Sequence, residues 1–317
     1  MPSVILEYNT KDLTTAGKTV MLSFILYMVD PFSLFFTVPI HFHGLNNGKR
    51  EVILFSGVGI TLAVALRELI RYRGVDLDGA VLVFFVIGFG FPVMLSLMST
   101  AFYLITQIRV MGRVAVVYLA STLTGILMVA FFQRSGDMMQ ETLTLFAQSL
   151  DALGLTAGSG VLFSSRQLAE AAVYTFTRVF AAMLIVQFGI GYGLAWEYLK
   201  RKKGLTVSLL DRISVPDWFI WVLLGSWTVI LLDIVLGLGM LGIIGWNLGL
   251  PAGLIYVLRG MALFRRISAK RRRVPFSGFQ IAIILMLVMF IPGVNILSLV
   301  ALGILGVSEI WIVYRNE

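Results

Sequence analysis

Long hydrophobic runs separated by short polar segments dominate this chain of 317 residues. Several runs approach the ~20 apolar residues that cross a bilayer as a helix, and FIWVLLGSWTVILLDIVLGL lacks the alternation of a membrane β-strand. The apolar segments fall near residues 19–40, 51–66, 79–107, 113–132, 168–196, 217–236, 239–262 and 277–314. The pattern predicts an all-α polytopic membrane bundle of eight to ten transmembrane helices, forming a single domain over residues 1–317.

Glycine and proline interrupt several segments, so the number of crossings stays open. Residues 277–314 would span ~57 Å as one helix against a ~30 Å hydrocarbon core, and FIPGVN offers a turn at Pro292-Gly293. GFGFP at 88–92 either turns a hairpin or only kinks one helix. Asp30-Pro31 predicts a break between two short helices, with Asp30 either capping a helix or coupling ions or protons.

The distribution of basic residues favours a protein of the bacterial inner membrane that crosses it ten times and has both termini in the cytoplasm. This arrangement places most lysines and arginines inside, including residues 67–73 and the basic loops at 197–216 and 263–276. It leaves Lys49, Arg50, Arg134 and Arg166 outside, and Arg178 within the bilayer.

The longest segment without a membrane-spanning pattern, residues 133–167, is expected outside the cytoplasm. Its apolar residues follow helical spacing and form one stripe, with the acidic residues off it. The stripe consists of Met139, Leu143, Phe146, Leu150 and Leu153. The helix either lies on the outer leaflet as an interfacial helix or covers a pocket as a lid.

Composition narrows the function classes. The chain is 58% hydrophobic and 13% charged, against ~25% charged residues in soluble domains. It has no cysteine, which excludes disulfides and cysteine-based chemistry. The net charge of +8 is assigned to loops beside anionic headgroups rather than to nucleic-acid binding.

No catalytic or cofactor motif is evident. His41 and His43 lack a nearby cysteine or carboxylate that would complete a metal site, and no nucleotide-binding loop, HExxH or Ser-His-Asp pattern occurs. We therefore expect neither an enzyme, nor a bound metal, nor a cofactor.

Polar residues at membrane depth are the candidate site. Arg178 would lie ~15 Å from the outer end of its helix, too deep to reach the headgroups fully. Asp233, Asn247 and Asn295 lie at similar depth on neighbouring segments. They predict one of two arrangements. The first is an outward-facing binding pocket. The second is a structural Arg178–Asp233 ion pair, with the two asparagines hydrogen-bonded to backbone groups that lack a partner within their helix.

The stretch GWNLGLPAGLIYVLRG at 245–260 adds to this site. Gly245, Gly249 and Gly253 lie four residues apart on one helix face, a spacing that permits close helix packing. Pro251 removes one intrahelical hydrogen bond, so a neighbouring helix, a water or a ligand must satisfy the freed carbonyl. Trp246 or Trp227 would supply a flat apolar wall for a ligand.

Three stretches resemble the YybS-type predicted membrane proteins, a bacterial family. They are VPIHFHGLNNGKRE (38–51), WNLGLPAGLIYVLRGMALFRR (246–266) and LGILGVSEIWIVYRN (302–316). The resemblance implies a distant similarity to the substrate-binding S components of energy-coupling-factor transporters, which capture a vitamin in an outward-facing pocket. Those components dock their coupling subunit through an alanine pair on the first helix, and here Ala16 is followed four residues later by Val20.

The sequence therefore predicts a membrane protein that binds a small molecule or vitamin through Arg178, Asp233 and Asn247, with transport energy from coupling subunits. The alternative is a non-transporting scaffold, similar to the cell-shape protein MreD, that holds envelope or division proteins. A third interpretation, a channel or proton-coupled carrier, depends on Asp30 and Glu309.

Overall fold

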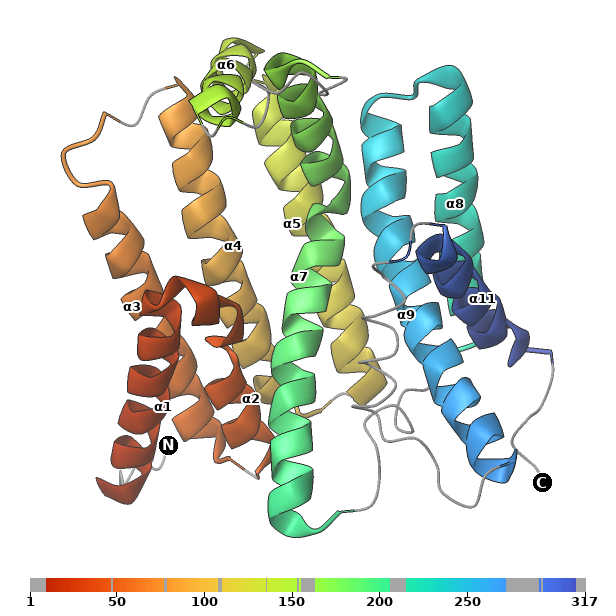
Figure 1. Ribbon diagram of the computed structural model, residues 1–317. Helices are drawn as coiled ribbons and strands as arrows, with labels where there is room; N and C mark the ends of the chain where they lie inside the picture. Colours follow the sequence, from red (N-terminus) through yellow and green to blue (C-terminus); the bar gives the residue numbers. More distant parts are fainter. Residues whose placement is uncertain are drawn as a thin grey trace, which may run out of the picture.

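The computed structural model describes residues 10–46, 48–76, 79–107, 110–134, 136–152, 154, 163–205, 215–271, 291 and 293–311. All regular elements within these residues are helices, and six of them are long and apolar enough to cross a membrane. They are α3 (Arg50–Arg71), α4 (Gly79–Leu104), α5 (Val110–Arg134), α7 (Ser165–Lys203), α8 (Phe219–Leu236) and α9 (Met240–Arg271). The chain is an integral membrane protein with the predicted all-α architecture (Figure 1).

The first apolar segment folds back on itself as a hairpin of short helices. It comprises α1 (Thr10–Met28), the 3-10 helix η1 (Asp30–Phe35) and α2 (Val38–Leu45). Both ends of this hairpin lie at the end of the bundle where α7 ends (Figure 1). Asp12 forms an ion pair with Lys49, N···O 2.6 Å, and the Lys202 ammonium lies 5.6 Å from the centre of the Phe42 ring. The hairpin thus enters and leaves at the same face.

The break falls at the predicted Asp30-Pro31, but Asp30 is not a helix cap. Pro31 occupies the first turn of η1, where its missing N–H has no cost, whereas the N-cap residue is Val29, without a side-chain hydrogen bond. The Asp30 carboxylate instead forms an ion pair with Arg67, N···O 3.4 Å. The capping interpretation was therefore wrong in its detail, although the break is real.

GFGFP does not turn the chain. Pro92 lies inside the continuous helix α4, so only the single-helix alternative of the sequence holds. The first segment turns back and α4 crosses once, so residues 67–73 lie at the end of the bundle opposite Lys200–Lys203. We call the end with Lys200–Lys203 the basic end. Arg50 begins α3 at this basic end. The two sequence assignments of these arginines were wrong. The two errors offset each other after α4, so the described later loops share the ends of the bundle as the sequence predicted.

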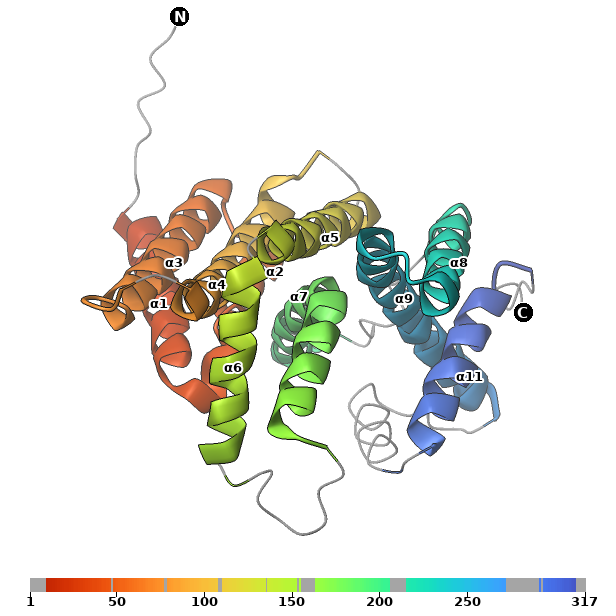
Figure 2. The same cartoon turned by 90° about the horizontal axis from the view of Figure 1, so that it is seen from above.

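The amphipathic helix α6 (Gly136–Ala152) lies across the end of the bundle, roughly perpendicular to its neighbours (Figure 2). Leu143 is buried and Met139 packs against the core, whereas Asp137, Glu141 and Asp151 are exposed. The predicted apolar stripe therefore faces the bundle, on α4 and α7. Leu153 lies outside the described residues.

Both ends of helix α7 have residues that stabilise a helix terminus. The Ser164 hydroxyl accepts the N–H of Gln167, and the Gln167 side chain accepts the N–H of Ser164, forming a capping box. At the other end Gly204 adopts φ +63°, a left-handed conformation that suits a helix C-cap. The last turn holds four basic residues, Lys200–Lys203, whose positive charges interact favourably with the negative end of the helix dipole.

Two backbone carbonyls in the interrupted stretch of α9 accept hydrogen bonds from a neighbouring helix. The Tyr118 hydroxyl donates to the Leu248 carbonyl at 2.9 Å, and Thr122 donates to the Asn247 carbonyl at 3.4 Å. The Asn247 carbonyl is the group that Pro251 leaves without an intrahelical donor. A neighbouring helix, α5, therefore supplies the partner that the sequence required.

Glycines set the spacing of the last helices. A Cβ at Gly245 or Gly249 would lie 2.8 Å or 2.7 Å from side-chain carbons of α8, so the predicted close packing is confirmed. Helix α11 (Val294–Ser308) approaches α9 more closely, since a Cβ at Gly260 would lie 1.8 Å from the Leu302 carbonyl oxygen. Gly293, with φ +81°, is the N-cap residue of α11. Pro292 and residues 272–290 lie outside the described residues, so the turn at Pro292-Gly293 stays a prediction.

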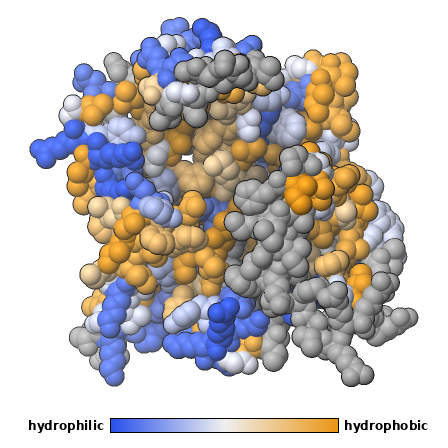
Figure 3. Space-filling model, in the orientation of Figure 1, coloured by the Kyte–Doolittle hydropathy of each residue, from blue (hydrophilic) through white to orange (hydrophobic). Residues whose placement is uncertain are grey.

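Hydrophobic residues form a belt around the face shown in Figure 3, with hydrophilic residues at both ends. This distribution matches a bilayer-spanning bundle whose ends meet water and headgroups. One hydrophilic patch interrupts the belt at the left. Polar residues at such a level are costly, so each requires a partner or water.

We expect Gly260→Ala to destabilise the protein, because the added methyl would meet backbone that cannot rotate away. The expected loss is about 1–3 kcal/mol, measured as a lower unfolding temperature in detergent. Gly189→Ala is the matched control, because a methyl group added at this helical glycine would meet no atom within 4 Å. Equal unfolding temperatures for the two variants would contradict the close α9–α11 contact.

Candidate functional site

Arg178 is nearly buried on α7, with 13% of its side chain exposed. Its guanidinium carbon lies 3.4 Å from the centre of the Tyr174 ring, and Nη1 donates to the Tyr174 carbonyl at 3.4 Å. Nη2 faces the Asp233 carboxylate at 3.6 Å, while the buried Nε has no hydrogen-bond partner. A guanidinium has five N–H donors, so this one retains capacity for another acceptor.

A hollow of about 280 Å³ lies against this guanidinium. Helices α5, α6, α7 and α9 contribute to its walls, together with Gly239 at the turn before α9. The lining residues are Val129, Met139, Leu143, Glu170, Val173, Tyr174, Thr177, Arg178, Gly239 and Ile243. Most of these are apolar, and the charged groups Arg178 and Glu170 belong to the same helix.

Asp233 occupies a site shaped for a carboxylate. It is buried at 7% exposure near the end of α8, and a Cβ at Gly242 of α9 would lie 2.0 Å from its Oδ1. Only glycine leaves room for the carboxylate at this point. The structure therefore brings Arg178 and Asp233 together as the sequence predicted, as an ion pair next to a hollow.

Asn247 is fully buried, and its amide joins α9 to α7. Oδ1 accepts the N–H of Ala181 at 3.0 Å, and Nδ2 donates to the carbonyls of Thr177 at 2.8 Å and Ile243 at 3.0 Å. Ala181 N–H and the Thr177 carbonyl are the groups that pair within a regular α-helix. Asn247 is not among the residues lining the hollow, and its contacts hold Arg178's helix in place.

The other predicted residues lie apart from the hollow. Trp227 is 40% exposed on α8, next to Gly253, and the Trp246 Nε1 is buried without a partner. Asn295 lies in the first turn of α11, which packs on α9, and its Oδ1 accepts the N–H of Ile296. None of the three lines the hollow.

Sequence reasoning did not identify Tyr174, Thr177 or Glu170 as parts of the site. The spacing of two of them offered a signal. Tyr174 lies four residues before Arg178 and Glu170 lies eight residues before it, so Glu170, Tyr174 and Arg178 share one face of a helix. The walls from α5 and α6 depend on tertiary packing and carry no such signal.

The two histidines have separate environments. His41 is fully buried, with Nδ1 3.1 Å from the Tyr103 hydroxyl and Nε2 3.3 Å from the Ser99 hydroxyl. His43 lies near the end of α2 and packs over Gly48. Within the described part of the chain, no three His, Asp or Glu residues gather as a metal site.

Comparison with protein-family models, curated proteins and solved structures finds no match to this chain.

We expect Asn247→Ala to lower the unfolding temperature markedly, because it removes two buried hydrogen bonds that join α9 to α7 and one within α9. The expected cost is about 2 kcal/mol. Gln148→Ala, an exposed amide on α6, is the control and should unfold like the wild type. A similar unfolding temperature for Asn247→Ala would show that the amide does not hold the two helices together.

Proposed function

We propose that this protein captures a small anionic solute in the hollow beside Arg178, within the bacterial cytoplasmic membrane. The observation that supports this proposal is the partnerless Nε of a nearly buried guanidinium against a 280 Å³ hollow. A guanidinium binds a carboxylate or phosphate through two parallel hydrogen bonds, of which Nε commonly supplies one.

The size and walls of the hollow favour a small ligand with an apolar part. Ligand pockets commonly measure about 300–1,000 Å³, so this one lies at the lower limit. Val129, Leu143 and Ile243 offer apolar contacts. The Thr177 hydroxyl donates to the Tyr174 carbonyl at 3.0 Å, so Arg178 is the donor left for an anion. A vitamin-sized carboxylate fits this description.

Helix α6 is suited to act as a lid. Met139 and Leu143 form part of the hollow, so the amphipathic stripe covers it as well as the bundle. Of the two interpretations of residues 133–167, these contacts favour the lid. A ligand would enter by displacing one helix that lies on the end of the bundle, without rearranging the membrane-spanning helices.

The charge distribution supports an outward-facing hollow. Lys200–Lys203 and Arg265–Arg266 lie at the end opposite α6. Loops rich in lysine and arginine stay in the cytoplasm. Applied here, the rule puts both ends of the N-terminal hairpin in the cytoplasm and the hollow on the outer side.

The proposal agrees with a YybS-type, S-component-like protein, in which transport energy would come from a coupling subunit. The first helix does not offer the usual docking pair for that subunit. Ala16 is 5% exposed, and the Val20 side chain packs against Gly59 of α3. A coupling partner would therefore need another surface of the chain.

We expect native mass spectrometry of gently purified wild-type protein to detect a bound small molecule that is lost in Arg178→Gln. The substitution removes the positive charge and the Nε donor, while its amide can still pair with Asp233. Arg201→Gln, at the exposed far end of the same helix, is the control and should retain the molecule.

A wild-type protein without any bound molecule, or a molecule retained by Arg178→Gln, would contradict the proposal. Co-purification of envelope or division proteins without a bound solute would instead support the MreD-like scaffold. Circular dichroism should give the same helical content for all three proteins, so that loss of the solute is not loss of folding.

A further inference from the structure

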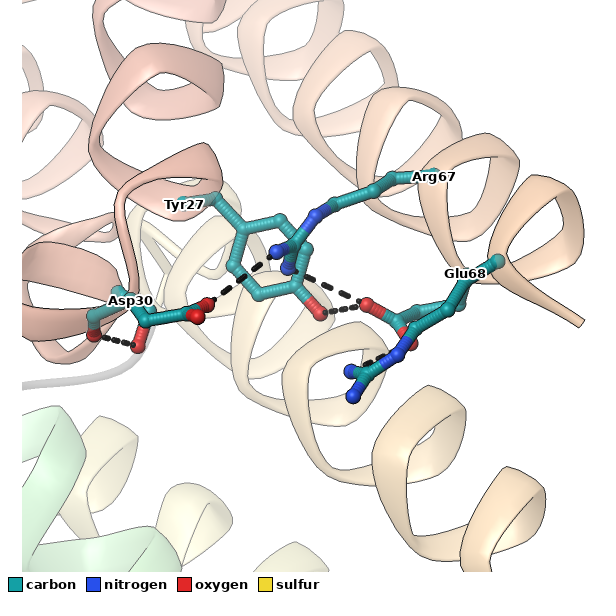
Figure 4. A network of polar contacts seen from close by, with 6 residues as sticks. Tyr27, Asp30, Arg67 and Glu68 are labelled. Atoms are coloured by element: carbon teal, nitrogen blue, oxygen red, sulfur yellow. Dashed lines mark hydrogen bonds and ion pairs between the residues drawn. The ribbon is translucent and has the colours of Figure 1, made fainter.

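The charged cluster at the tip of the N-terminal hairpin shows how this bundle holds ionised groups (Figure 4). Oε1 of Glu68 accepts hydrogen bonds from the Tyr27 hydroxyl at 2.8 Å and from Arg67 Nη1 at 3.3 Å. Arg67 Nη2 also lies 3.4 Å from Asp30, and Arg71 Nη1 lies 3.8 Å from the other oxygen of Glu68. Two arginines thus balance two carboxylates. A balance of the same kind constrains what the hollow beside Arg178 binds.

The wall of the hollow carries a second charged group, Glu170. Glu170 lies eight residues before Arg178 on α7, and Tyr174 lies midway between them, so the three share one helix face. At ~1.5 Å rise per residue, the Cα atoms of Glu170 and Arg178 are ~12 Å apart along the helix axis. The hollow therefore meets a positive group at one level of α7 and a negative group about two turns away.

The directions of the two side chains preserve this separation. Arg178 Nη1 donates to the carbonyl of Tyr174, one turn earlier in α7. Glu170 Oε1 accepts from Arg166 Nε at 3.1 Å, also one turn earlier. Because both charged groups lean toward the start of the helix, they stay ~12 Å apart. Two charge-assisted hydrogen bonds of ~3 Å each then leave ~6 Å between the charged groups of a solute that contacts both.

Glu170 is open to a solute. Its side chain is 51% exposed, and that of its partner Arg166 is 63% exposed. Ion pairs as exposed as this one contribute little to stability, so a positive group of a solute can replace Arg166 at low cost. Arg166 Nη2 also donates to the Gln140 side chain on α6 at 3.1 Å, and this contact does not depend on Glu170.

A solute with a negative charge alone matches this wall poorly. The Arg178 guanidinium already faces the Asp233 carboxylate at 3.6 Å, and Glu170 adds a second carboxylate to the surroundings. Both carboxylates repel a bound anion, and charges away from bulk water are screened weakly. A positive group placed toward Glu170 turns one of these repulsions into an attraction.

The rest of the wall is mainly apolar. Val173 of α7, Met139 and Leu143 of α6 and Ile243 of α9 all line the hollow. Methylene groups gain free energy by leaving water for such a wall, whereas polar groups without partners lose it. An α-amino acid carries its ammonium and carboxylate groups on one carbon atom, so it is too short to reach both charged groups of the wall.

We propose that the captured solute is an amino-carboxylate whose ammonium and carboxylate groups are separated by several methylene groups. The carboxylate binds Arg178, the ammonium group binds Glu170, and the methylene groups lie along the face of α7 that carries Tyr174. Glu170 is then the residue that determines specificity. This inference rests on the proposed binding of an anionic group beside Arg178.

Isothermal titration calorimetry of the full-length protein in detergent tests the inference with three probes. The probe δ-aminovalerate has both charged groups and a methylene spacer, valerate lacks the ammonium group, and glycine lacks the spacer. We expect the wild type to bind δ-aminovalerate about tenfold more tightly than valerate or glycine, the gain from one hydrogen bond to a charged group. Arg178→Gln should lose the binding of both δ-aminovalerate and valerate.

Variants of the ion pair separate specificity from structure. Glu170→Gln should bind δ-aminovalerate and valerate with similar affinity, because the negative charge that faces the ammonium group is gone. Arg166→Gln should increase the preference for δ-aminovalerate, because it removes the competing cation; a purely structural ion pair would give the same change in both variants. Glu197→Gln, a partly exposed carboxylate near the other end of α7, is the control and should keep the wild-type preference.

Equal affinity of the wild type for δ-aminovalerate and valerate, or an unchanged preference in Glu170→Gln, would overturn the inference. Valerate binding that is lost in Arg178→Gln would still support capture of an anion in that case. Binding of neither probe to the wild type would also overturn the inference, and the native mass spectrum of the wild type would then decide the proposed function by itself.

Discussion

The cost of holding a guanidinium away from water governs the centre of this structure. Arg178 lies within an apolar bundle, and translocon-based scales put the cost of an arginine at membrane depth at roughly 3 kcal/mol. Three features offset it: the Tyr174 ring, the Asp233 carboxylate and the adjoining hollow. Asp233 fits only because Gly242 has no side chain, and α7 is held beside α9 by Asn247.

The same requirement explains the irregular stretch of α9. Proline and asparagine in an apolar helix free a carbonyl and bury an amide, and both need partners inside the membrane. Thr122 of α5 reaches the freed carbonyl, and the amide reaches two backbone groups of α7. The glycines of this stretch bring α8 close enough for Asp233 to meet Arg178. The irregular stretch thus joins α9 to α5, α7 and α8.

Sequence patterns predicted the features that depend on local periodicity. The helical class, the amphipathic stripe of α6, the close glycine face of α9 and the Arg178–Asp233 pair all follow from spacing or from unpaired charge. The path of the first segment does not, because a 19-residue α1 is long enough to suggest a crossing. Its reversal depends on the packing of α1 against α3 and of η1 against α7. Asn247 was identified correctly as a costly residue but faces the backbone of α7 rather than the hollow.

The central claim is that water reaches the hollow from the side opposite the basic loops. The chain has no cysteine, so a single Thr177→Cys substitution reports on this hollow without background. A membrane-impermeant maleimide added outside intact spheroplasts should label it, as it should label Ser149→Cys on the exposed face of α6. Labelling of Ser149→Cys alone would mean that the hollow is closed to water, and labelling of Thr177→Cys only after the membrane is opened would mean that it faces the cytoplasm; either result would contradict the account.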